Sequence, residues 1–210
     1  MIIYKQILLL PFVFLALFKN QCHLKTNVNT FFKYTESRHF SMVNEFKPKR
    51  MGISINLYRL PKAEKLDDIK DLESQIAKTA DTRVDLYKNS GDLAVVFLNT
   101  TDPYRSTNTI PYKMLYGKKV DKSIDNVGEI GGFLPSSEIP GIVSWIKANK
   151  IDTFDGFSKI YDNLSPEVKK ELEDMDTYDK VSLFVDYVRP LVVLYFTALE
   201  NENSVIFAGR

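Results

Sequence analysis

Residues 51 to 210 contain no histidine and no cysteine, although the whole chain has two histidines and one cysteine. His23, His39 and Cys22 all lie in the first fifty residues, which in turn lack glycine and aspartate. Ser-His-Asp and Cys-His mechanisms and most zinc sites require imidazole or thiol groups. Carboxylates are therefore the remaining catalytic option after residue 50, and the single cysteine excludes an internal disulfide.

The sign of the charge also changes near residue 50. Residues 1–50 hold eight Lys and Arg against two Glu, a net charge of +6. The remaining residues hold 20 basic against 25 acidic side chains, a net charge of −5. A mildly acidic body without a basic cluster argues against a nucleic-acid partner, because binding a phosphate backbone needs several convergent Lys or Arg.

Three interpretations fit residues 1–50. Ile7 to Phe18 form an apolar run behind Lys5, as in a secretory signal, but no small-x-small cleavage site follows. The run is short for a membrane span, although an uncleaved anchor in residues 1–18 stays open. We favour the third interpretation, in which translation starts at Met51 and residues 1–50 are a spurious extension read from A/T-rich DNA. The protein is then cytoplasmic, with a membrane-anchored or exported protein as the alternative.

Hydrophobic periodicity predicts the elements that follow. Residues 53–57 alternate in the manner of a half-buried strand that ends before Pro61, and residues 66–80 carry an apolar helical face. Residues 93–98 fit either a strand or a buried helix. Residues 100–132 contain many prolines and glycines, including Gly131 and Gly132, and are predicted to be a loop.

The C-terminal half is predicted to be mostly helical. One helix follows Ser136 or Ser137 as its cap, and a second begins at Ser165-Pro166-Glu167. The longest helix, 178–199, carries too many charges for a bilayer span and is expected to kink at Pro190. A closing strand follows at 205–207. Residues 51–210 are therefore expected to fold as one compact α+β domain, rich in helix, with a small mixed or antiparallel sheet.

Four segments of this domain stand out. They are Met51-Gly52-Ile53-Ser54 before a strand, an apolar segment containing Lys88, Gly-Gly-Phe-Leu-Pro-Ser-Ser-Glu at 131–138, and Tyr195 to Leu199 before the last strand. Together they resemble the YfbM-like family, a bacterial domain of unknown function. The resemblance covers residues 51–210 and implies a compact α+β fold without an assigned reaction. Family members can carry a Trp and a His after the lysine, where this chain has Ser90 and Ala94.

Acidic side chains give two candidate metal or catalytic sites. Asp152 and Asp155 beside Gly156 could act as paired acids, but a helix cap and turn before Phe157 explains them as well. The acidic run 171–179 lacks the glycine and terminal glutamate of a calcium loop and fits a solvated helix end. We therefore predict no metal ion and no cofactor.

The loop Asp102-Pro103-Tyr104-Arg105 is the best candidate for contact with a ligand or partner. Arginine beside tyrosine can hold an anionic or planar group, although Asp and Pro at these positions also suit a plain type I turn. Lys88 is a further candidate.

Two classes of function stay open. We favour a small non-catalytic protein that binds an unidentified protein or small molecule. The alternative is a carboxylate-based hydrolase that uses a divalent metal.

Overall fold

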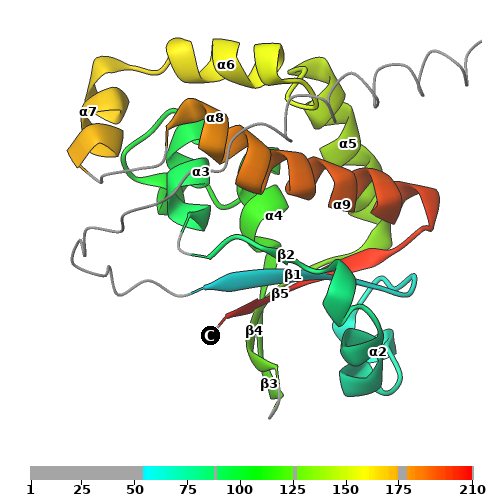
Figure 1. Cartoon of the computed structure of the whole chain (residues 1–210). Coiled ribbons are helices and arrows are strands. Elements are labelled where there is room, and N and C mark those ends of the chain that lie inside the picture. Colours follow the sequence, from blue (N-terminus) through cyan, green and yellow to red (C-terminus); the bar gives the residue numbers. More distant parts are fainter. Residues whose placement is uncertain (1–53, 88, 125–126, 175–178, 210) are drawn as a thin grey trace, which may run out of the picture. The chain divides into compact units, whose positions relative to one another are not determined.

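The computed structural model describes residues 54–87, 89–124, 127–174 and 179–209 (Figure 1). The predicted N-terminal extension and the candidate Lys88 lie outside these described residues. Within them the α+β prediction is confirmed, because helices pack on a five-stranded sheet in which every pair of neighbouring strands is antiparallel.

The sheet has the strand order β2-β1-β5-β4-β3. Its strands are β1 (Ile55–Leu60), β2 (Val84–Asp85), β3 (Lys118–Ile124), β4 (Gly128–Leu134) and β5 (Ser204–Gly209). The predicted first and last strands are both confirmed, and the last one lies at the centre of the sheet between β1 and β4. Strand β5 thus joins the β1-β2 pair to the β4-β3 pair in one sheet.

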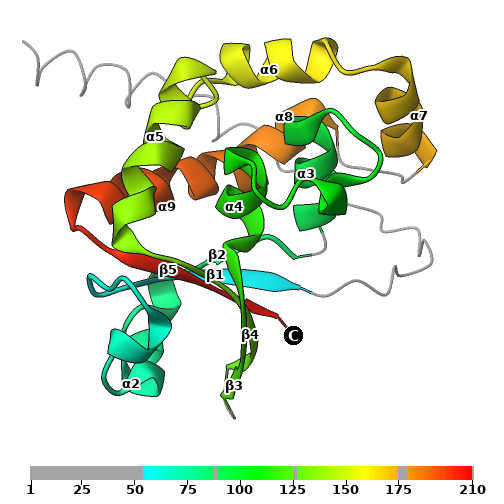
Figure 2. The ribbon, with the colours of Figure 1, turned by 180° about the vertical axis from the view of Figure 1, so that it is seen from behind.

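Helices cover the two faces of the sheet unequally (Figures 1 and 2). The larger core lies between the sheet and a layer made of α3 (Ser90–Leu98), α4 (Ile110–Tyr116), α5 (Ile139–Ala148), α6 (Phe154–Asp162), α7 (Pro166–Asp174), α8 (Lys180–Leu183) and α9 (Arg189–Glu200). The smaller core lies under α2 (Leu72–Lys78) on the opposite face. Tyr58 is therefore buried as well as Leu57, and the expectation of a half-buried first strand is wrong.

Residues 180–200 form one continuous helix with a π-helical segment, Phe184–Val188, between α8 and α9. Pro190 lies two residues after that segment, and the wider π turn accommodates a residue that has no N–H to donate. By length and hydropathy this is the one described helix able to span a membrane. Half of its most apolar window is buried in the molecule, as expected of a core helix.

The predicted helix 66–80 is interrupted. A 3-10 turn, Leu66–Asp68, precedes α2, and Asp71 between them has a left-handed φ of 50°. Another 3-10 turn, Ala80–Thr82, follows. The ambiguous apolar segment 93–98 is helical and belongs to α3, where it is almost completely buried.

The prediction of a loop over residues 100–132 is wrong. This segment contains a 3-10 turn, Pro103–Arg105, followed by α4, β3 and most of β4. Thr109 caps α4 by accepting a hydrogen bond from the Tyr112 amide, and Pro111 sits in its first turn. Strand β3 lies at the edge of the sheet and is mostly exposed, so it lacks the apolar alternation by which strands are detected.

Ser136 and Ser137 do not cap the following helix as predicted. They form a 3-10 turn, Ser136–Glu138, and both hydroxyls donate to the carboxylate of Glu64. Helix α5 then begins at Ile139 with Pro140 in its first turn.

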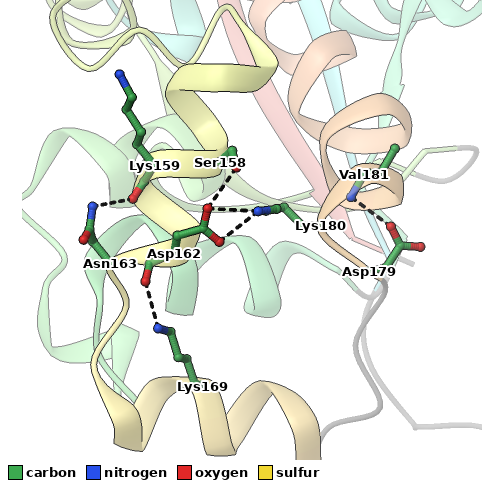
Figure 3. Close-up of polar contacts among 8 residues, drawn as sticks. All are labelled: Ser158, Lys159, Asp162, Asn163, Lys169, Asp179, Lys180 and Val181. Atoms are coloured by element: carbon green, nitrogen blue, oxygen red, sulfur yellow. Dashed lines mark hydrogen bonds and ion pairs between the residues drawn. The ribbon is translucent and has the colours of Figure 1, made fainter.

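The helical layer is held together on one side by Asp162 at the end of α6 (Figure 3). Its carboxylate accepts a hydrogen bond from Ser158 at 3.0 Å and from Lys180 Nζ at 2.8 Å. Its backbone carbonyl accepts one from Lys169 Nζ, also at 2.8 Å. One residue thus joins α6, α7 and α8. The predicted start of α7 is confirmed, since Ser165 Oγ accepts from the Val168 amide.

Candidate functional site

A pocket of about 880 Å³ lies where α3 and α4 meet the sheet. Its size falls within the range of small-molecule sites. The helices and the loop between them contribute Ser90, Gly91, Tyr104, Thr107, Asn108, Tyr112, Lys113, Tyr116 and Gly117. The sheet contributes Ile55, Lys118, Lys119, Glu129, Gly131, Phe207 and Gly209.

Strand register places two rows of residues on the floor of the pocket. Lys119 pairs with Gly132, and Gly132 pairs with Phe207, so these three side-chain positions share one face of the sheet. Phe207 belongs to the larger, helix-side core and lines the pocket, so this is the pocket face. The second row contains Glu129, which pairs with Gly209.

Glycines set the distance between the helices and this floor. A Cβ at Gly132 would lie 1.8 Å from the carbonyl oxygen of Tyr116, which means that the end of α4 rests directly on β4. A Cβ at Gly131 or Gly91 would have no atom within 4 Å. These two glycines therefore leave pocket space that a side chain would otherwise fill.

Three tyrosines form one wall. The ring of Tyr116 lies with its centroid 4.8 Å from that of Tyr112 and 6.1 Å from that of Tyr104. Tyr104 is 62% exposed. The Tyr116 hydroxyl is buried and makes no hydrogen bond of normal geometry with a described residue, although the side chains of Ser90 and Tyr104 lie near enough to influence its pKa. An unpaired buried hydroxyl costs about 1–3 kcal/mol, so a ligand that supplies an acceptor would recover that free energy.

Burial also changes the acidity of these tyrosines. Loss of hydration raises the pKa of Tyr116 well above its ordinary value, and the neighbouring Tyr104 adds to that shift. Burial and Tyr104 likewise raise the pKa of Tyr112. Both phenols are therefore neutral hydrogen-bond donors at physiological pH, not candidates for a general base.

Some of the charged side chains that line the pocket form ion pairs and others do not. Lys113 Nζ lies 3.1 Å from Glu138 Oε2, and Lys118 Nζ is ion-paired with the other oxygen of the same carboxylate. Burial alone would raise the pKa of Glu138, but hydrogen bonds from Lys118 and Lys113 lower it overall. Lys119 and Glu129 are exposed on the floor and form no ion pair with a described residue.

The predicted loop reaches this pocket through Tyr104 alone. The carboxylate of Asp102 lies 2.7 Å from Arg105 Nε, and neither residue lines the pocket. The Arg105 side chain is 88% exposed. Seven of the sixteen lining residues come from α4, β3 and β4, the elements that the loop prediction missed. The Thr109-Ile110-Pro111 sequence, a cap followed by an early proline, is the signal by which α4 could have been found.

Asp152 and Asp155 lie elsewhere, on either side of Thr153, which caps α6 by accepting a hydrogen bond from the Gly156 amide. Both aspartates are exposed. Within the described ranges, no three His, Cys, Asp or Glu side chains form a group that could hold a metal ion. The two aspartates are thus not part of such a group.

No family model and no curated protein matches the chain. Among solved structures, the chain is similar to YfbM from Escherichia coli. That protein, whose function is unknown, is 16% identical, with a TM-score of 0.47 over 74% of this chain and 99% of that chain. The match concerns the fold alone.

Proposed function

We propose that this protein is a non-catalytic binding protein for a small molecule, held in the pocket between α3, α4 and the sheet. The single observation that carries the proposal is the buried Tyr116 hydroxyl without a partner, set in a tyrosine-lined pocket of about 880 Å³. An apolar, aromatic wall with a few fixed polar groups is the usual composition of a ligand site.

A binding role suits the groups around this pocket better than a catalytic one. The tyrosines are neutral donors, and Lys113 and Lys118 are both bound to Glu138. Neither histidine nor cysteine occurs anywhere in residues 51–210. A nucleophile with an adjacent base, which covalent catalysis requires, is not assembled by the described lining residues.

A fragment screen on the full chain tests this proposal. Planar fragments with hydrogen-bond acceptors should raise the melting temperature of the wild type, since a ligand that binds only the folded state stabilises it. Gly131→Trp should abolish these shifts by filling the pocket. Gly141→Trp is the matched control, because a Cβ at Gly141 also meets no atom within 4 Å, but this glycine does not line the pocket. Equal responses of the two variants would contradict the proposal.

We also propose a cytoplasmic location, because no small-x-small cleavage site follows the apolar run Ile7 to Phe18 and translation is expected to start at Met51. Cell fractionation combined with the N-terminal mass of the native protein tests it. Recovery in the soluble cytoplasmic fraction with Met51 as the first residue is expected. Recovery in the membrane fraction with residues 1–18 retained would overturn this part of the proposal.

A further inference from the structure

The charges on the pocket floor bear on the chemical class of ligand. Lys119 stands on the same face as Phe207, with Gly132 between them in the sheet. Its neighbours Lys113 and Lys118 share Glu138, whereas Lys119 forms no ion pair with a described residue. Lys119 is therefore the lysine of the pocket lining whose charge remains available to an incoming group.

The opposite end of the pocket is less suited to an anion. Ser90 and Gly91 come from the first turn of α3, and the amides of a helix start ordinarily attract negative groups. The buried Asp92 already places an acidic side chain in this same turn. Glu129 lies in the other floor row, beside Gly209. A negative group is thus favoured at Lys119 over Glu129, and the start of α3 already carries an acidic side chain.

The three tyrosines of the pocket wall favour a ligand with a flat apolar ring system. Tyr112 and Tyr116 are tilted to one another at 43°, and the exposed Tyr104 completes the cluster. Aromatic faces of this kind take planar ring systems by stacking or edge contacts. A ring can approach the exposed Gly131 without meeting a side chain there, whereas the neighbouring Gly132 is covered by the end of α4.

We infer that the ligand is a planar organic anion, with its ring against the tyrosines and its negative group on Lys119. This inference rests on the proposed function, since it concerns the occupant of the same pocket. The negative group can be a carboxylate or another single anion, because one lysine recognises charge rather than the geometry of a particular oxyanion.

Three probes with one ring system test the inference on the full chain: 2-naphthoate, 2-naphthylmethanol and 2-naphthylmethylammonium. Titration calorimetry at low salt should show the anion binding about threefold more tightly than the neutral alcohol, as expected for an ion pair with an exposed lysine. The cation should bind more weakly than the alcohol. Equal affinity of anion and alcohol, or tightest binding of the cation, would overturn the inference while leaving a binding pocket. Failure of all three to bind would instead count against the proposed function.

Two substitutions test whether the preference for the anion comes from the charged side chains on the floor of the pocket. Lys119→Gln should remove the preference for 2-naphthoate over the alcohol and leave the affinity of the alcohol within about twofold, since the lost group is an exposed charge. Glu129→Gln, an exposed charge on the same floor, should increase that preference. An unchanged preference in Lys119→Gln would overturn the placement of the anion. Thermal melting of both variants checks that they fold.

Discussion

The hydroxyl of Tyr195 in α9 donates a hydrogen bond of 2.7 Å to the backbone carbonyl of Met114 in α4. Both residues are fully buried. Met114 lies in the last turn of α4, where carbonyl groups have no partner within the helix. Tyr195 therefore supplies a missing partner and fixes the short helix that carries Tyr112 and Tyr116 into the pocket.

Tyr195→Phe should lower the free energy of unfolding by about 1–3 kcal/mol, because it leaves a buried carbonyl without its donor. Tyr116→Phe is the matched change, since it removes a hydroxyl that has no described partner. This second variant should be as stable as the wild type or more stable, yet bind planar acceptors less tightly. Urea denaturation measures both variants. A loss of stability in Tyr116→Phe equal to that in Tyr195→Phe would show that its hydroxyl is already bonded in the free protein.

Gly132→Ala should destabilise the protein by about 3 kcal/mol, at the upper end of overpacking effects. The reason is the contact between β4 and the end of α4, where the new Cβ would meet the Tyr116 carbonyl oxygen at 1.8 Å. Gly131→Ala, one residue earlier in the same strand, meets no atom and should be tolerated. Thermal and urea unfolding compare the two. Similar stabilities would mean that α4 does not rest on the strand at this point.

Stability should fall as the pH is lowered, in part through Glu138. Its pKa in the folded protein is lowered from the ordinary value of 4.5, with hydrogen bonds from Lys118 and Lys113 outweighing the effect of burial. A lowered pKa contributes stability above the unfolded value, and that contribution is lost as pH falls from about 4.5 through the folded pKa. Glu138→Gln should therefore lose less stability than the wild type between pH 6 and pH 3, two round values chosen to span about 4.5.

Substitution of a lysine that pairs with Glu138 checks whether this carboxylate causes the loss of stability at low pH. Lys118→Met should also reduce the dependence of stability on pH, because it removes one of the two donors to the Glu138 carboxylate. Denaturant midpoints at each pH measure the slope for the three proteins. If the slope is the same in all of them, other carboxylates with lowered pKa, such as Asp162 and Asp179, account for the acid sensitivity instead.

The elements with strong local signals could be predicted from the sequence. The strand before Pro61, the helix that starts at Pro166 and the core helix before Asn201 all have regular periodicity or a clear cap. Strand β4 could not be predicted from its glycine-rich sequence, because glycine occurs both in turns and where two backbone segments approach closely. Gly132 serves the second purpose, beneath Tyr116, and only the packing of α4 on the sheet reveals this.

The pocket was equally hard to predict, because its parts come from distant segments. Of the candidate loop Asp102-Pro103-Tyr104-Arg105, only Tyr104 lines it, and the neighbouring Arg105 is paired with Asp102 instead. Lys119 lies on an exposed edge strand, where a lysine normally needs no functional explanation. Its position opposite Gly132 and Phe207 follows from strand register, which the sequence does not specify when the edge strand lacks an apolar pattern.

Amide chemical shifts of the full chain titrated with 2-naphthoate test the central claim most directly. We predict saturable shifts concentrated at the pocket, around Ser90, Tyr104, Tyr116, Lys119 and Gly131. A second hollow of about 380 Å³, lined by Phe97, Asn149 and Lys159 among others, serves as the internal control. Shifts centred on that hollow, or scattered without saturation, would contradict the assignment of the α3, α4 and sheet pocket as the binding site.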